Sequence, residues 1–286
     1  MGGQSWWGRV YLVGVLVAFL PAAAAASDAL PDLSKLSADA QAEWLTGAAR
    51  DGTLDKLDDD ALVTLFKGVS SEGLASYVEH GVEPLGEYEF EMLRQERVNQ
   101  RWPREPEHIA VRYRQSPLQI YAKWLPGGPH KGQEVLYDET RRANQMFGHL
   151  GGLLSAVSIW ASVNGPFARA QSNHSILDIG LQYVAHRYAS EVAKFHEAGI
   201  DYPTDVEVTH DRGMRLVVFT YESPVGQPTY YAKRERLGID LQHPWFRSVE
   251  SFDNDGQVFE RIFYDKVVPR QFDDATFDPT NADYRF

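Results

Sequence analysis

The spacing of apolar residues changes from a helical to an alternating period near residue 85. Before that point an Ala-rich segment at 38–49 ends at Asp51 and Gly52, and two later segments begin after an aspartate or a serine. These residue types cap the N-termini of helices. Within the segments, apolar residues recur every three or four positions, as on one face of a helix. Residues 27–84 are therefore predicted to form short helices.

From residue 87 onward, apolar and polar residues alternate over several segments. In the first segment Tyr88, Phe90 and Met92 fall on one face and three glutamates fall on the other. Further strands are predicted at 109–114, 118–124, 135–137, 145–150, 206–209, 214–221, 230–238, 245–252 and 257–264. The connections are short and contain Gly or Pro, which favours antiparallel neighbours. The segment 214–221 is apolar on both faces, which predicts a place in the middle of the sheet.

One long helix, predicted at 175–198, interrupts the strands. Ser175 and Asp178 form a capping-box pattern at its start, and Gly199 ends it. Its apolar residues form one stripe: Leu177, Leu181, Val184, Tyr188, Val192 and Phe195. Because an exposed stripe of this size promotes aggregation, we expect it to cover the concave side of the sheet, opposite Trp124 or Tyr137.

The first 26 residues have the three-part layout of a secretory signal. The stretch 1–9 carries one positive charge and no acid, 10–20 is an apolar run too short to span a bilayer with ease, and Pro21 precedes five alanines. We expect cleavage after Ala26, a periplasmic or secreted protein, and no stable membrane span after cleavage. A retained membrane anchor is the alternative. A lipid anchor is excluded because no cysteine follows the apolar run.

Composition limits which classes of protein and of binding partner fit the chain. The chain has 286 residues and no cysteine, so the exported form must be stabilised by its core rather than by disulfides. Removing the signal leaves 27 basic and 40 acidic residues, a net charge of 27 − 40 = −13. Such acidity argues against nucleic acids and anionic membrane surfaces as partners.

Several segments resemble, in the right order, the family called domain of unknown function 1571, a family of exported bacterial proteins. They read YEFEMLRQER at 88–97, VRYRQSP at 111–117, GQEVLY at 132–137, GHLGGL at 148–153 and DATFDPTNADYRF at 274–286. The resemblance covers about two-thirds of the chain. It departs at 173–178, where NHSILD replaces the family's Arg-x-Pro-Ile-Thr-Glu, although Asp178 keeps the capping role.

The resemblance implies a LolA-like fold, the half-barrel of lipoprotein carriers. The expected fold class is then α+β: an antiparallel, strongly curved half-barrel sheet with a long helix on its concave face, preceded by short N-terminal helices. The expected domains are a signal peptide at 1–26, a helical extension at 27–84 outside the resemblance, and the half-barrel at 85–286.

No catalytic constellation is found. The sequence from His149 to Gly152, followed by Ser155, is compatible with an esterase oxyanion hole, but the G-x-S-x-G nucleophile motif is missing, which favours a simple turn. The nine histidines form no metal-binding motif, so we expect them to be solvated and predict neither a metal nor another cofactor. The glutamates of the first strand are expected to form ion pairs across strands, with Arg112 or Arg114.

Aromatic residues are abundant, at 12% of the chain. A curved sheet covered by one helix is not always filled by side chains, which leaves room for an acyl chain. The residues predicted to line such a pocket are Tyr113, Trp124, Tyr137, Leu181, Val184, Tyr188, Phe219 and Trp245.

Two functions are compatible with these patterns, and neither is enzymatic. The first is an exported soluble protein that binds or shuttles an apolar ligand, lipid-like or a lipoprotein, in the cell envelope. The alternative is a structural or adaptor module of the envelope that uses residues 27–84 to dock a partner protein.

Overall fold

Eleven antiparallel strands form one sheet in the computed structural model, which describes residues 30–224 and 229–286. Residues 32–286 form one compact unit, and the fold is that of this unit. The strands are β1 (Glu87–Glu96), β2 (Glu107–Arg114), β3 (Gln119–Trp124), β4 (Glu134–Asp138), β5 (Gln145–His149), β6 (Ile159–Ser162), β7 (Asp205–Asp211), β8 (Met214–Glu222), β9 (Arg234–Asp240), β10 (Phe246–Phe252) and β11 (Val258–Pro269). The predicted signal at 1–26 lies outside the described residues.

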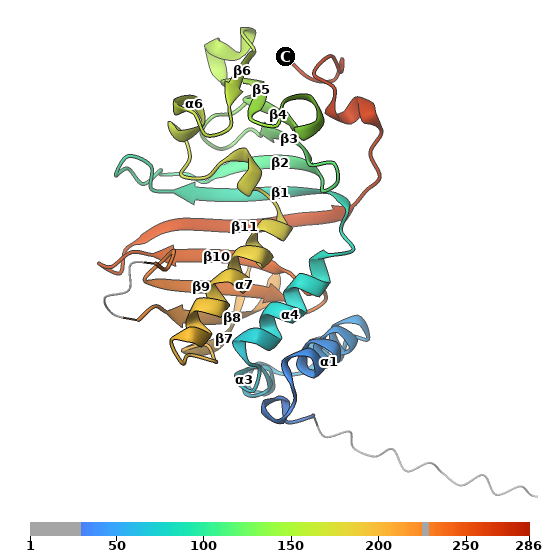
Figure 1. Cartoon of the computed structure of the whole chain (residues 1–286), viewed down its shortest axis with the longest axis vertical. Helices are drawn as coiled ribbons and strands as arrows, with labels where there is room; N and C mark the ends of the chain where they lie inside the picture. The colour runs from blue at the N-terminus through green and yellow to red at the C-terminus, as the bar shows by residue number, and fades with distance from the viewer. Residues whose placement is uncertain (1–29, 225–228) are drawn as a thin grey trace, which may run out of the picture. The chain divides into compact units, whose positions relative to one another are not determined.

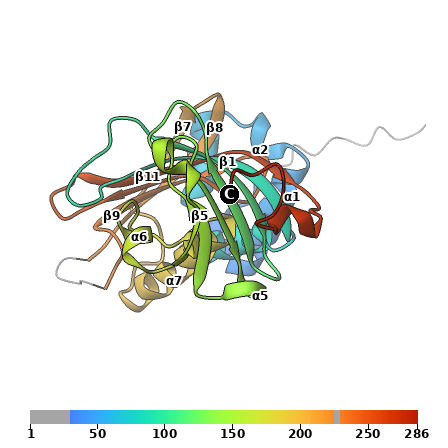
Figure 2. The same ribbon diagram turned by 90° about the horizontal axis from the view of Figure 1, so that it is seen from above.

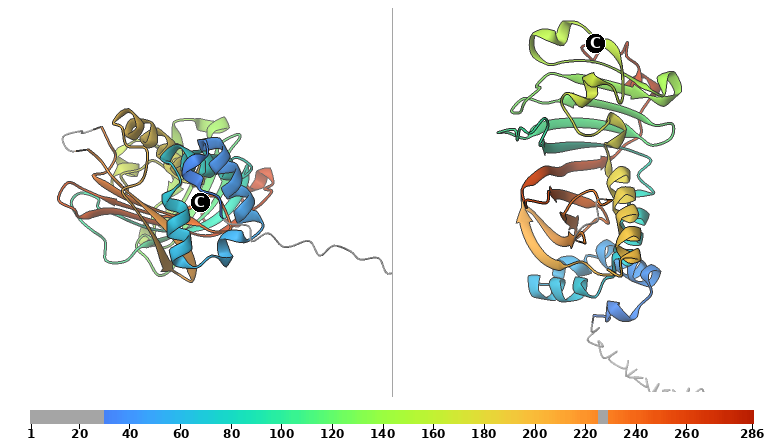
Figure 3. Two further views of the ribbon diagram at one scale, coloured as in Figure 1. Left: turned by 90° about the horizontal axis from the view of Figure 1, so that it is seen from below. Right: turned by 60° about the vertical axis from the view of Figure 1, so that its left-hand side comes forward.

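The sheet consists of two meanders that meet where β1 pairs with β11. The strand order is β6-β5-β4-β3-β2-β1-β11-β10-β9-β8-β7. The chain therefore runs outward from β1 to the edge strand β6, crosses to the opposite edge at β7, and returns inward to β11 (Figure 1). The crossing is made by α6 (Pro166–Arg169), a turn of 3-10 helix at Ile176–Asp178 and the long helix α7 (Leu181–Glu197), which lies across the face of the curved sheet (Figures 1 and 3).

Four short helices precede the sheet, as the helical period predicts. They are α1 (Ala38–Arg50), α2 (Thr53–Lys56), α3 (Asp59–Lys67) and α4 (Ser71–Val82). Ser37, Asp58 and Ser70 cap α1, α3 and α4 by accepting hydrogen bonds from backbone N–H groups of the first turn. No helix in the described part of the chain is long and apolar enough to cross a bilayer.

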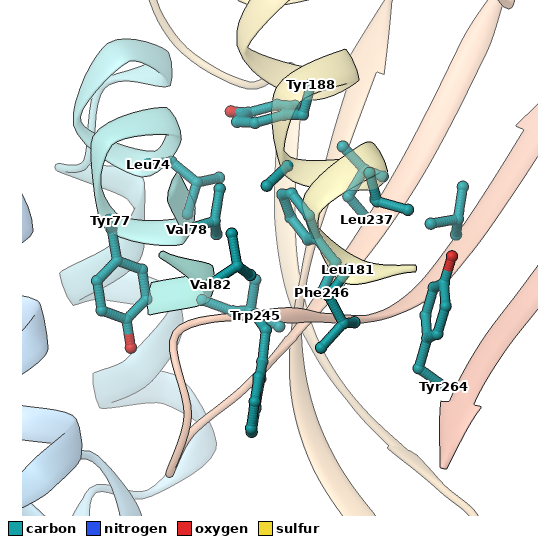
Figure 4. Packing of buried hydrophobic residues seen from close by; sticks show 14 of the residues in the cluster. Leu74, Tyr77, Val78, Val82, Leu181, Tyr188, Leu237, Trp245, Phe246 and Tyr264 are labelled. Carbon is teal, nitrogen blue, oxygen red and sulfur yellow. The ribbon is translucent and has the colours of Figure 1, made fainter. Parts of the chain in front are cut away.

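The main core lies between α4, α7 and the concave face of the sheet. Leu74 and Val78 of α4 face Leu181 and Tyr188 of α7, and side chains of β9, β10 and β11 complete the cluster (Figure 4). The apolar stripe is buried from Leu181 to Phe195, as predicted, whereas Leu177 precedes α7 and is only partly buried. Because α4 shares this core, the N-terminal helices are packed into the same compact unit as the sheet.

Tyr88 of β1 fixes the start of α7 on the sheet. Its hydroxyl accepts a hydrogen bond from the Leu181 backbone N–H at 2.8 Å and donates one to Gln182 at 2.7 Å. Gly180, at φ 113°, lies so close that an added Cβ would be 2.9 Å from this hydroxyl. The α-helix therefore begins at Leu181 rather than at 175, and Ser175 with Asp178 caps the separate 3-10 turn.

The C-terminal segment covers the opposite, convex face of β3 and β4. Tyr121 stacks on Tyr284 with ring centroids 3.9 Å apart, and Leu136 is buried in the same cluster. The buried Glu134 carboxylate accepts hydrogen bonds from the Tyr121 hydroxyl and the Arg285 backbone N–H. Figure 2 shows this segment and α6 on opposite sides of the strands. The Tyr-x-Phe sequence at the C-terminus therefore packs the last segment onto β3 and β4.

Two strand predictions need correction. The edge strand β6 was not predicted, and β8 lies next to the edge strand β7 rather than in the middle of the sheet. Its convex face is apolar because Leu216 and Val218 form a small cluster with Phe263 of β11. Ion pairing across strands is confirmed for Arg114, which lies 3.0 Å from Glu87.

Candidate functional site

A cavity lies between the concave face of the sheet and the segment that leads into α7. The residues 163–180 form this segment, here named the cover. The sheet contributes Met92, Arg94, Ile109, Trp124, Val135, Met146, Val249, Glu260, Ile262 and Tyr264 to the lining, and Gln133 immediately precedes β4. The cover contributes Phe167, Ala168, Gln171, Ser172, His174, Ser175, Ile176, Asp178 and Ile179, and α7 contributes Tyr183, Val184 and Arg187.

The apolar floor of the cavity follows from strand register. Met92 of β1 is opposite both Ile109 of β2 and Tyr264 of β11, and Ile109 is opposite Trp124 of β3. Directly opposite residues on antiparallel strands point to the same face, so four neighbouring strands present one apolar row. The alternation that builds the core therefore also builds the cavity.

The cavity is narrow in this conformation. Its volume is about 70 Å³, which is room for a few water molecules. Sites for organic ligands commonly enclose roughly 300–1,000 Å³. An acyl chain can enter only if the cover or its neighbours move.

Two of the eight predicted pocket residues, Trp124 and Val184, line the cavity. The other six are buried in the surrounding core. Tyr113 packs against Gly180 and Tyr88, and Leu181 is at the start of α7. The Tyr137 hydroxyl donates to the Ala143 carbonyl at 3.0 Å.

The remaining three predicted residues lie in other parts of that core. The Tyr188 hydroxyl is 2.6 Å from the Tyr221 hydroxyl, beneath α7. Phe219 of β8 packs edge-on against Phe66 of α3. Trp245 is buried next to His243, beyond β9. These side chains fill the core and do not line the cavity.

Polar contacts attach the cover to the sheet at the end of β1. The Ser172 hydroxyl donates to Glu96 at 3.0 Å, and the Asn173 backbone N–H donates to the same carboxylate at 2.7 Å. The Arg94 guanidinium donates to the Ser172 hydroxyl at 3.2 Å. One carboxylate and one guanidinium, both on inward-facing positions of β1, therefore hold the middle of the cover.

His174 provides the second attachment. Its Nε2 lies 2.5 Å from a Glu260 carboxylate oxygen, and the Tyr231 hydroxyl contacts both groups at 3.0 and 3.1 Å. The other ring nitrogen faces Asp178 at 3.8 Å. Ser251 of β10 also donates to Glu260, at 3.2 Å.

These contacts belong to a buried group of charges, named here the ionic cluster. Its members are Arg94, Glu96, Glu107, His174, Asp178, Arg187, Glu235 and Glu260. Register explains part of it, because Glu96 is opposite Glu260 and Ser251 joins that row to Glu235. Arg187 of α7 pairs with Glu235 and lies 4.1 Å from the centroid of the Tyr231 ring.

The ionic cluster sets the charge of His174. Burial lowers the pKa of His174, but the hydrogen bonds to Asp178 and Glu260 and the nearby negative charges outweigh it and raise that pKa to about 9. Burial raises the pKa of Glu260, and the His174 contact more than offsets this, so the Glu260 pKa falls below its usual value. The pair is therefore an imidazolium and a carboxylate at neutral pH.

Glu96, His174 and Glu260 offer ligand atoms that all lie within 4.8 Å of one another, the one such group found in the described part of the chain. A metal ion there would have to break the contact between His174 and Glu260. It would also lie near the Arg94 guanidinium, which is 3.0 Å from Glu96. The arrangement fits an ion-pair network better than a metal site.

Three buried polar atoms of the lining have no hydrogen-bond partner among the described residues. They are the Trp124 indole nitrogen, the Gln133 side-chain oxygen and one terminal nitrogen of Arg187. Such groups are rare in folded proteins and need an explanation.

The expectation of solvated histidines is wrong for His149 and His174. His149 is 1% exposed, and the side chain of His174 is 12% exposed. A signal for the ionic cluster was present in the sequence: Glu96 and Glu260 continue the inward-facing positions of their strands, where apolar residues are the norm. Charged residues on a core face are rarely left without partners.

Comparison with known proteins places this geometry in a family. The model of the family described as protein of unknown function (DUF1571) matches residues 85–286. None of the curated proteins matches the chain.

Several solved structures are similar at low identity. An uncharacterised conserved protein from Thermus thermophilus has a TM-score of 0.41 and 11% identity over 73% of this chain and 96% of its own. MucB in complex with MucA, from Pseudomonas aeruginosa, has a TM-score of 0.38 and 12% identity over 70% of this chain and 60% of its own. A LolA superfamily protein from Nitrosomonas europaea has a TM-score of 0.31 and 9% identity over 73% of this chain and 98% of its own.

Proposed function

The chain belongs to the family of proteins of unknown function DUF1571, and for this member we propose a role as a carrier that binds an apolar, lipid-like ligand beneath the cover, without catalysis. The observation that carries the proposal is the apolar row of Met92, Ile109 and Trp124, which faces a cavity instead of a helix. The signal-like sequence at 1–26 supports action outside the cytoplasm, in the periplasm or beyond the cell.

The cover supplies the movement that a carrier requires. It contributes nine residues to the lining. It begins directly after β6 and contains no strand, so no backbone ladder ties it to the sheet. Its attachments through Ser172, Asn173 and His174 are hydrogen bonds and ion pairs. Water can replace such contacts when the cover lifts, so opening leaves no polar group without a hydrogen-bond partner. Ligand entry therefore requires displacement of one segment rather than unfolding of the sheet.

An adaptor role has weaker support. In that role residues 27–84 would be free to dock a partner protein. However, α4 packs on α7 through buried side chains of both helices. A segment that completes the core of its own chain offers only its outer surface to a partner.

The test is uptake of a lipid by the chain without its first 26 residues. After expression in a bacterial periplasm, native mass spectrometry should detect a co-purified lipid, and the protein should bind the fluorescent fatty acid 11-(dansylamino)undecanoic acid. Ala168→Trp places a bulky ring in the lining and should block uptake. Ala170→Trp, at an exposed position two residues away, is the matched control and should leave uptake intact.

Bare protein that takes up no lipid, charged or uncharged, would contradict the proposed role. Equal uptake by both tryptophan variants, each confirmed as folded by circular dichroism, would place the binding site elsewhere.

A further inference from the structure

We propose that the ligand carries an uncharged, oxygen-containing head group, as in a monoacylglycerol or a long-chain alcohol, and that Trp124 and Gln133 recognise it. This inference rests on the proposed function and narrows its ligand class.

The first observation is a pair of unsatisfied polar groups at one place in the lining. Trp124 is 7% exposed and Gln133 is 4% exposed, yet the indole N–H and the amide oxygen have no partner among the residues that the structure describes. The two residues are neighbours, because the Trp124 backbone N–H donates to the Gln133 carbonyl at 2.9 Å. A buried donor and a buried acceptor thus lie on adjacent residues of one apolar cavity.

The second observation concerns charge. Each cation of the ionic cluster already has a carboxylate partner: Arg94 pairs with Glu96 and Glu107, Arg187 with Glu235, and His174 with Glu260 and Asp178. The cluster holds five carboxylates against three cations. Among these cations, a fatty-acid carboxylate or a phosphate can therefore accept only from the Arg187 nitrogen that has no partner in the described part of the chain, and Glu235 already offsets the charge of Arg187. It would also face an excess of two negative charges in the cluster.

Hydrogen bonding disfavours an amine head group, which would satisfy the Gln133 oxygen but leave both N–H donors of the lining without a partner. An ammonium group can only donate, whereas two of the three unsatisfied groups, on Trp124 and Arg187, are N–H donors. A hydroxyl group fits, because it accepts from the indole N–H and donates to the Gln133 amide oxygen. An ester carbonyl also satisfies the indole donor.

The tail has an apolar path next to this pair. Ile109 lies opposite Trp124, Met92 lies opposite Ile109, and Val135 of β4 lies two residues after Gln133. Head-group recognition at Trp124 and Gln133 therefore places the hydrocarbon chain along the floor of the cavity.

The experiment compares ligands that share one tail. Displacement of 11-(dansylamino)undecanoic acid from the chain without residues 1–26 is measured at pH 7 with 1-monooleoylglycerol, oleic acid and oleylamine. We expect monooleoylglycerol to bind at least tenfold more tightly than the two charged lipids. Trp124→Phe keeps an aromatic ring but loses the N–H, and it should weaken monooleoylglycerol binding about fivefold while oleic acid binding is unchanged.

A matched control is available in Trp245→Phe. Trp245 is also buried, and its indole N–H has no partner within the described part of the chain, but it does not line the cavity, so its substitution should leave the preference intact. Oleic acid binding as tightly as monooleoylglycerol, or a preference that survives Trp124→Phe, would overturn the inference while leaving the carrier role in place. Failure of all three lipids and the dye to bind would overturn the carrier role itself, and the inference with it.

Discussion

His174 should make the stability of the protein depend on pH in a way that can be calculated. Its pKa is about 9 in the folded protein, against about 6.5 in an unfolded chain. Its side chain is 12% exposed, and its partners Glu260 and Asp178 belong to β11 and to the cover. Protonation of this one ring thus strengthens an attachment between cover and sheet.

The sign and size follow from linkage. A group whose pKa is raised by folding stabilises the protein fully below its unfolded pKa, and that stabilisation is lost as the pH rises through the folded pKa. The difference of 2.5 pH units corresponds to roughly 3 kcal/mol at 1.36 kcal/mol per unit. The loss should occur between about pH 6.5 and pH 9. Asp178 and Glu260 do not titrate there, because the contact with His174 holds the pKa of both below the usual value despite their burial.

Urea unfolding, followed by tryptophan fluorescence at pH 6, 7.5 and 9.5, measures this effect. His174→Gln removes the titrating ring, so the gap in unfolding free energy between the wild-type protein and this variant should shrink as the pH rises. His196→Gln is the matched control: His196 lies on the exposed side of α7, with its side chain 59% exposed, and solvent screens its contacts.

A gap between the wild-type protein and His174→Gln that stays constant from pH 6 to pH 9.5 would refute the reasoning. A gap that shrinks equally for His196→Gln would show that the ionic cluster is not its source.

Three further predictions concern packing and are tested by thermal and urea unfolding. Leu181→Asp places a charge at a position that is 1% exposed and should prevent folding, at a cost of several kcal/mol; unchanged melting would mean that the face of α7 is misassigned. Tyr188→Phe removes the hydrogen bond to Tyr221 and should cost about 1 kcal/mol; a loss below about 0.3 kcal/mol would show that this bond contributes little. Deletion of residues 32–84 should leave an unfolded chain, because α4 shares the core of α7; a soluble, folded remainder would contradict this.

The period of the apolar pattern predicted most of the fold, because an element that is buried on one face has apolar residues at regular spacing in its sequence. The alternation of Tyr88, Phe90 and Met92 gave β1, and the stripe of α7 gave its buried side. The pattern failed where burial is slight or has another source. The edge strand β6 pairs on one side only and has Ile159 45% exposed, so it shows no alternation. The apolar convex face of β8 comes from a local cluster.

The candidate site was harder to predict because apolar sequence patterns report burial, not what a side chain is buried against. Tyr188 and Phe219 are buried against other side chains, whereas Trp124 is buried against a cavity, and the apolar pattern does not distinguish these two cases. The useful exceptions are polar. Glu96 and Glu260 occupy inward-facing strand positions, and that violation of the pattern marks the attachment of the cover.

Polar and apolar contacts of the cover differ in what their loss costs when the proposed carrier opens. When the cover lifts, water can solvate Ser172, His174 and Glu260, so their loss is partly compensated. Phe167 and Ile176 of the cover have no such compensation, since their apolar surfaces would face water at about 25 cal/mol per Å². An apolar tail in the cavity would restore those contacts. Opening should therefore be unfavourable in water and favourable against a lipid, which couples movement of the cover to the presence of its ligand.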